Sequence, residues 1–163
     1  MTSSPRVARP DNSPGDSAVD GLLAGTGAGL LMALYVGAVG RLSGQAWRDI
    51  LAQFDPSPAP SPFTGVVAHL AVAGVHGLVF ALAWHWLRRA APRVPGWLAG
   101  LVYGLVLWLL AVVLLRLSPA ATPEGWLAGV APVHLAVAHL IYGLALGWLL
   151  GRRALVPEHS PTL

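Results

Sequence analysis

Histidine is the residue type with the most chemical scope here at neutral pH, and four of the six histidines lie inside long apolar stretches and are not assigned to the membrane interface. They are His69, His76, His134 and His139. A neutral imidazole can ligate haem iron or another metal, and it can relay protons. Ionisable residues are costly in apolar surroundings and tend to mark functional sites there. These four are therefore the candidate cofactor-binding residues.

The spacing of the histidines suggests how they would be arranged. His69 and His76 are seven residues apart, so on a helix they share one face, about 10 Å apart along the axis. His134 and His139 are five residues apart, about 140° around a helix. His69 and His134 lie at similar depths in their stretches. If those helices meet, the two side chains would face each other and could hold one b-type haem, whereas two haems would lack room.

A structural role for the same histidines remains open. Each imidazole could instead hydrogen-bond to a backbone carbonyl or to a side chain of another helix, as polar residues do in membrane bundles. Potential partners are Thr26, Tyr35, Tyr103 and Tyr142. His85, between two tryptophans, is assigned to the membrane interface, and His159 lies in the tail without neighbours that suggest a site.

Other chemistry finds little support. The absence of cysteine excludes disulfides, thiolate metal ligands and a cysteine nucleophile. The apolar stretches contain no acid, so a carboxylate-coupled transporter would lack its usual proton carrier. No phosphate loop, Gly-x-Ser-x-Gly elbow or His-Glu-x-x-His zinc pattern occurs. No catalytic residue is predicted, no metal is assigned, and a non-enzymatic role is favoured.

The elements that would position the histidines are membrane-spanning helices. Of the 163 residues, 55% are hydrophobic and 10% are charged, against about 25% charged in soluble domains. Four apolar stretches without Asp, Glu, Lys or Arg cover residues 21–40, 66–87, 97–115 and 126–151. Each is near or above the roughly 20 residues that span a bilayer as a helix. The sequence predicts an all-α fold, a bundle of four transmembrane helices.

Terminal and loop patterns complete this organisation. Residues 1–17 read as a disordered tail, 18–153 as one transmembrane domain and 154–163 as a second tail. Ser17 and Asp20 resemble a capping box before the first helix, and Thr64 could cap the second. Pro132 either kinks the fourth helix or begins its regular part. Apolar residues spaced like a helix face predict a short interfacial helix over residues 45–54.

Arginines and tryptophans indicate the orientation. Seven of the ten arginines lie in or beside the two tails and in the loop between the second and third helices. The positive-inside rule therefore places both termini in the cytoplasm. The sequence has no lysine and no basic stripe, which argues against nucleic-acid binding despite the basic pI. An aromatic belt is expected on the cytoplasmic side from Trp84, Trp86, Trp97 and Trp148.

Glycines recur every four residues on three of the four helices, which places them on one helix face. Such faces let helix backbones approach closely in lipid, where the hydrophobic effect does not drive helices together. The predicted packing positions are Gly21, Gly25, Gly29, Gly96, Gly100, Gly104, Gly143 and Gly147. The pattern does not distinguish contacts within one chain from contacts in a homo-oligomer or with a membrane-protein partner.

The chain also shows signs of duplication. Residues 21–34 match residues 96–109 at seven of fourteen positions, and His69-Leu-Ala-Val-Ala73 recurs as His134-Leu-Ala-Val-Ala138. Each half would be a helical hairpin entering from the cytoplasm. Two such hairpins would be related by a pseudo-twofold axis along the membrane normal.

The last helix reads His139-Leu-Ile-Tyr142-Gly143-Leu-Ala-Leu146-Gly147, and the first is rich in glycine. In these features the chain resembles a group of small uncharacterised bacterial inner-membrane proteins with four spans. The resemblance implies a bacterial plasma membrane and brings no established activity. The leading hypothesis is a non-enzymatic accessory or scaffolding component. The alternatives are a single-haem electron-transfer protein and a carrier of small solutes or lipids.

Overall fold

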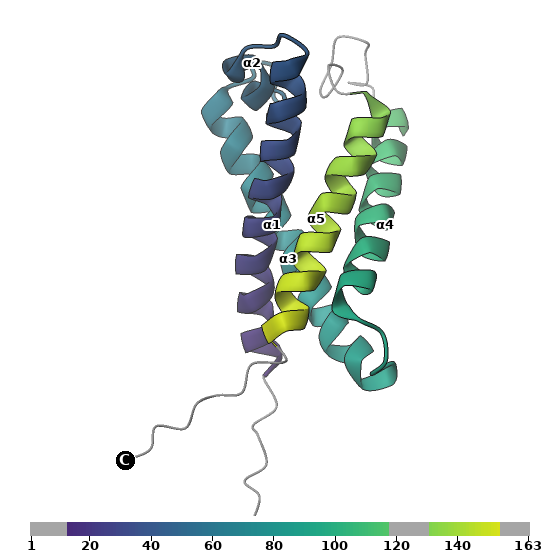
Figure 1. The fold of residues 1–163 in the computed structure, drawn as a ribbon. Coiled ribbons are helices and arrows are strands. Elements are labelled where there is room, and N and C mark those ends of the chain that lie inside the picture. Colours follow the sequence, from purple (N-terminus) through teal and green to yellow (C-terminus); the bar gives the residue numbers. More distant parts are fainter. Residues whose placement is uncertain (1–12, 118–130, 154–163) are drawn as a thin grey trace, which may run out of the picture.

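The computed structural model describes residues 13–117 and 131–153, and within these ranges every regular element is a helix (Figure 1). The helices are α1 (Pro14–Leu42), α2 (Trp47–Ala52), α3 (Pro62–Ala90), α4 (Gly96–Leu117) and α5 (Pro132–Arg153). The four long ones have the length and composition needed to cross a membrane. The predicted all-α bundle of four such helices, with a short extra helix in the first long loop, is therefore confirmed.

The first helix begins earlier than predicted. Ser13 is its N-cap: the Ser13 Oγ accepts the N–H of Asp16 at 3.1 Å, and the Asp16 carboxylate accepts the N–H of Ser13 at 3.1 Å. The capping box expected at Ser17 and Asp20 is thus wrong by one helical turn. Pro14 explains the choice, because its fixed φ suits the first position of a helix. Residues 13–17 are therefore capped helix start and not part of a tail.

The other helix boundaries also differ in detail. α3 begins at Pro62 after an N-cap at Ser61, not at Thr64. α5 begins at Pro132, so this proline starts the described helix and does not kink it. α2 covers six residues, fewer than the predicted 45–54. Residues 1–12, 118–130 and 154–163 lie outside the described part, including the tails and the predicted start of the last span.

Glycine contacts join the helices into two hairpins. A Cβ on Gly25 of α1 would lie 2.7 Å from the Cα of Gly77 on α3. A Cβ on Gly100 of α4 would lie 2.8 Å from the Cα of Gly147 on α5. All eight glycines predicted to pack lie at these two crossings. Backbone therefore meets backbone at both, an approach that any side chain would prevent.

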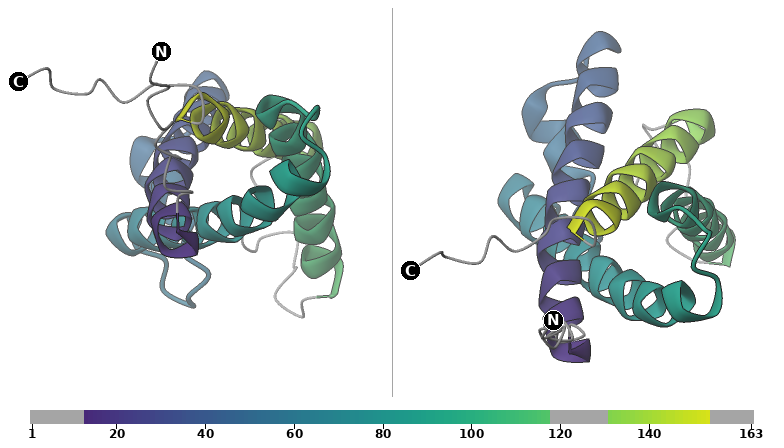
Figure 2. Two further views of the ribbon diagram at one scale, coloured as in Figure 1. Left: turned by 90° about the horizontal axis from the view of Figure 1, so that it is seen from below. Right: turned by 60° about the horizontal axis from the view of Figure 1, so that its bottom comes forward.

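The two hairpins associate mainly on one side. α1 packs extensively against α5, whereas α3 touches α4 at only a few positions (Figure 2). α3 and α4 leave their short connecting turn and splay apart toward the end of the bundle that carries α2 (Figure 1). A strict twofold repeat would make these two contacts equal, so the tertiary structure departs from that symmetry between the hairpins.

The register of the proposed repeat also differs from the sequence match. Gly77 and Gly147 occupy corresponding places, since each meets the glycines of the preceding helix in its own hairpin. Alignment of α3 with α5 by these glycines differs by five residues from their alignment by the shared His-Leu-Ala-Val-Ala sequence. It aligns His69 with His139, not with His134.

Two residues assigned to the aromatic belt lie in the interior instead. Trp84 is 6% exposed and its ring stacks 6.3 Å from that of Phe80. His85 is 5% exposed, and its Nδ1 is hydrogen-bonded to Ser17 at 3.3 Å. The belt assignment is therefore wrong for both residues. Neighbours on a helix point about 100° apart, so the two residues face different surroundings: Trp84 lies against the bundle core and His85 against α1.

The connector between α2 and α3 is organised by one carboxylate. Asp55 accepts the backbone N–H groups of Ser57 and Ser61, each at 2.9 Å. The N–H groups of Ser61 and Ser57 hold the pKa of the Asp55 carboxyl below its ordinary value. A group with a lowered pKa stabilises the fold fully above its unfolded pKa, and loses this contribution as the pH falls through the folded pKa.

We expect the Asp55 contacts to fail in acid, as the pH falls from the ordinary aspartate pKa of about 4 through the lowered pKa of the folded state. Amide hydrogen exchange in residues 47–61 should be faster in Asp55→Asn than in the wild-type protein at pH 7. The difference between the two proteins should disappear as the pH falls through the lowered pKa of Asp55 in the folded state, because the wild-type carboxyl then becomes protonated. Asp49→Asn is the control, because Asp49 is exposed on α2. Equal protection of wild type and Asp55→Asn at pH 7 would contradict the assignment.

Candidate functional site

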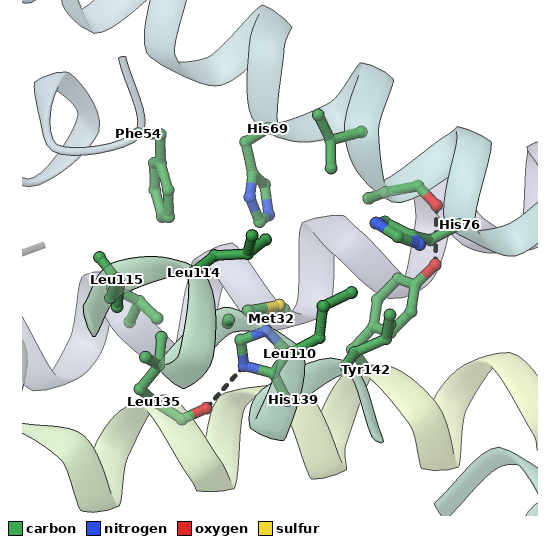
Figure 3. Close-up of a pocket in the computed structure, with 15 residues that line it drawn as sticks. Met32, Phe54, His69, His76, Leu110, Leu114, Leu115, Leu135, His139 and Tyr142 are labelled. Atoms are coloured by element: carbon green, nitrogen blue, oxygen red, sulfur yellow. Dashed lines mark hydrogen bonds between the residues drawn. The ribbon is translucent and has the colours of Figure 1, made fainter. Parts of the chain in front are cut away.

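A cavity of about 230 Å³ lies in the half of the bundle nearer α2, where α3 and α4 splay apart. Its wall comes from all four long helices and from Phe54, which follows α2 (Figure 3). Most lining residues are apolar. The four polar ones are His69, His76, His139 and Tyr142. Three of the four histidines singled out by the sequence thus share one cavity.

The cavity opens sideways between α3 and α4. Val72 of α3 lines it and is 57% exposed, and Leu110 and Leu114 of α4 line it and are 46% and 56% exposed. Since the long helices have the composition of membrane spans, this side of the bundle faces hydrocarbon when the chain is in a bilayer. A molecule dissolved in the lipid could therefore reach the cavity without passing through water.

His69 is held by both a hydrogen bond and a ring contact. Its Nε2–H donates to the backbone oxygen of Gly29 on α1 at 3.0 Å. Its ring lies 4.4 Å from the ring of Phe54, centroid to centroid, at 32°. A carbonyl oxygen can only accept, so this bond places the single proton of a neutral ring on Nε2. The second nitrogen, Nδ1, is left with a lone pair.

His139 approaches the same space from α5. Its Nδ1–H donates to the oxygen of Leu135, one turn earlier, at 2.8 Å. In Figure 3 the rings of His69 and His139 point toward each other across the cavity, and the second nitrogen of His139 points away from Leu135 into it. By the same reasoning this nitrogen, Nε2, carries a lone pair in the neutral ring.

His76 and Tyr103 form a reciprocal pair that joins α3 to α4. The Tyr103 O–H donates to the backbone oxygen of His76 at 3.0 Å. The His76 Nδ1 lies 3.3 Å from the same phenol oxygen. Because the one phenol proton goes to the carbonyl, the His76 Nδ1–H is the donor in the second bond. Its Nε2 then has the lone pair.

Tyr142 is a wall residue that sequence analysis considered only as a hydrogen-bond partner. It is 2% exposed, and its O–H donates to the backbone oxygen of Ala73 at 2.7 Å, which ties α5 to α3 across the bundle. Phe54 was not anticipated at the site. Its position follows from the fold of the α2–α3 connector, which no local pattern specifies.

His134 lies elsewhere, so the expected pair of His69 and His134 is wrong. The His134 Nδ1 is hydrogen-bonded to the Tyr35 hydroxyl of α1 at 3.0 Å. It lines a separate pocket of about 140 Å³ near the end of α1 that leads into α2. The reason is rotational: His139 is about 140° around α5 from His134, so only one of them can face the cavity.

Each of the four histidines thus has a hydrogen-bond partner, as the structural alternative in the sequence analysis anticipated. Within the described ranges no three His, Asp or Glu side chains lie close enough to hold a metal ion. The cavity is also smaller than the about 300–1,000 Å³ of sites for drug-sized ligands. A haem exceeds such ligands in size, so the fit for one is poor.

Comparison with known proteins gives one result. A family model described as a family of unknown function (DUF6789) matches residues 14–160. No curated protein and no solved structure matches the chain.

Proposed function

The chain belongs to the DUF6789 family of unknown function, and we propose its role from its own geometry. It is a non-enzymatic accessory protein of a membrane that binds a small lipid-soluble ligand in the cavity between α3 and α4. The observation that carries this proposal is the combination of a lateral opening, an apolar wall and a few inward polar groups. Such a combination is typical of ligand sites.

The fold supports binding over scaffolding through the glycine faces. All eight predicted packing glycines are used within the two hairpins, so these faces are not available to a partner. Protein interiors leave few voids larger than a water molecule. A bundle with only a packing role would therefore not be expected to contain this cavity. The lateral opening also agrees with the carrier alternative, for which binding from the lipid is the first step.

The location proposed with this function is a bacterial plasma membrane with both termini in the cytoplasm. The end of the bundle where α1 begins and α5 ends carries Arg88, Arg89 and Arg152. Arg89 lies 5.4 Å from the Trp86 ring, and Arg152 lies 4.0 Å from the ring of Trp148. Arginines that pair with tryptophans in this way are suited to a charged interface.

Filling the cavity should remove the ligand. Ala111 lines the cavity from α4, and Ala111→Phe places a ring inside it. We expect a lipid-soluble compound to copurify with the wild-type protein in near-equal molar amount and to be lost from Ala111→Phe. The measurement is mass spectrometry of organic extracts from protein purified in native membrane patches.

Val113→Phe is the matched control, since Val113 is 51% exposed on α4 and does not line the cavity. This variant should retain the compound. Extracts that are the same for wild type and Ala111→Phe, with both proteins folded, would overturn the proposal. A Soret band in the purified protein, lost in His69→Ala or His139→Ala, would also overturn it in favour of a haem protein.

A further inference from the structure

We infer that the cavity selects a lipid-soluble molecule with a hydroxyl group, such as a phenol, which donates a hydrogen bond to an imidazole nitrogen of the wall. This inference rests on the proposed ligand-binding function and specifies the chemistry of the ligand. It follows from an account of every polar side chain among the described residues that line the cavity.

All the side-chain donors of this wall are already used. His69 donates its N–H to the oxygen of Gly29, and His139 donates its N–H to that of Leu135. His76 donates to the phenol oxygen of Tyr103. The fourth polar residue, Tyr142, donates its hydroxyl proton to the oxygen of Ala73. A neutral imidazole has one N–H and a tyrosine has one O–H, so none of the four has a second proton to offer.

The acceptors remain open. The lone pairs left are those of His69 Nδ1, His76 Nε2 and His139 Nε2, together with the phenol oxygen of Tyr142. Figure 3 shows the nitrogen of His139 that is turned away from Leu135 directed into the cavity, and the ring of His76 at the cavity wall. Protonation of a ring would create a donor, but an isolated cation is strongly disfavoured at membrane depth. The wall therefore accepts hydrogen bonds and does not donate them.

Polarity and size together define the ligand class. An acceptor-only molecule, such as an ether or a ketone, would find no donor here and would leave the imidazole lone pairs unpaired. A cavity of about 150 Å³ holds a benzene ring, so 230 Å³ accommodates a phenol. A longer alkyl substituent would extend through the opening past Val72 and Leu114 into the lipid.

A pair of matched probes tests the inference. 4-Fluorophenol and 4-fluoroanisole share the same ring and differ in whether the oxygen carries a proton or a methyl group. ¹⁹F NMR of the full chain in lipid nanodiscs reports each bound probe, with empty nanodiscs as the reference for partition into lipid. We expect the phenol to bind about tenfold more tightly than the ether, the value of one hydrogen bond of about 1.4 kcal/mol.

Variants identify the acceptor. Among His69→Leu, His76→Leu and His139→Leu, the variant that removes the acceptor should lose most of this preference, because leucine keeps the wall apolar and has no lone pair to offer. If none of the three reduces the preference, the inference is wrong. His134→Leu, outside the cavity, should retain the full preference. Equal binding of the two probes by the wild-type protein would overturn the inference and leave the proposed function intact. If neither probe binds in a cavity-dependent way, judged against Ala111→Phe, both proposals fail.

Discussion

Gly25→Ala should destabilise the protein, whereas Gly27→Ala, two residues away on the same helix, should not. A Cβ on Gly25 would lie 2.5 Å from the backbone oxygen of Ala73 and 2.7 Å from the Cα of Gly77. Both obstacles are backbone atoms of α3, so no rotamer change can relieve the clash and the helices must separate. Overpacking of this kind costs about 1–3 kcal/mol, and sometimes more.

The control differs only in what surrounds the added methyl group. A Cβ on Gly27 meets nothing within 4 Å among the described residues. Alanine is favoured over glycine in a helix by up to about 1 kcal/mol, so Gly27→Ala should be neutral or stabilising. The measurement is the free energy of unfolding in mixed micelles, followed by loss of helical circular dichroism. If both variants unfold like the wild-type protein, the close crossing of α1 and α3 is not present.

Leu146→Ala should loosen the contact between the two hairpins. Leu146 on α5 has no exposed surface and belongs to the same buried cluster as Ala28 of α1 and Phe80 of α3. In lipid the removed atoms lose little transfer energy, because hydrocarbon surrounds them in the unfolded state as well. The cost is mainly that of the empty volume and the lost dispersion contacts. We expect about 2 kcal/mol, the lower end of the range for such truncations.

Leu144→Ala provides the comparison for this second prediction. Leu144 is 44% exposed on the opposite side of the same helix turn, so its truncation should change the free energy of unfolding by less than about 0.5 kcal/mol. Both variants remove the same atoms from α5, and they differ only in burial. Equal effects of the two truncations would show that α5 does not pack into the bundle through Leu146.

The histidines show how far reasoning from sequence can reach toward a site. Their presence in apolar stretches correctly directed attention to them, and three of the four line one cavity. Their grouping was wrong, because the repeated His-Leu-Ala-Val-Ala sequence suggested His134 as the partner of His69. A short apolar match does not determine the register of two helices. The glycine contacts do, and they set His139 opposite His69.

Helix boundaries show a similar limit. Both Ser13-x-x-Asp16 and Ser17-x-x-Asp20 have the spacing of a capping box, one turn apart. Either could start a helix locally, and the structure uses the first, which has a proline after the serine. Composition distinguishes membrane spans from loops well. The choice between two possible caps depends instead on the positions of a few atoms, which a sequence pattern does not specify.

The class of the fold can be read from the amino-acid sequence: four long helices, their order, the small-residue faces through which they pair and the residues able to do chemistry. These properties depend on composition and on the 3.6-residue period of the helix, which are local. The splaying of α3 and α4 and the turning of His134 away from the cavity become visible in three dimensions. Those outcomes depend on which helix backbones approach each other closely. Contacts between residues far apart in the chain produce no periodic pattern in the sequence.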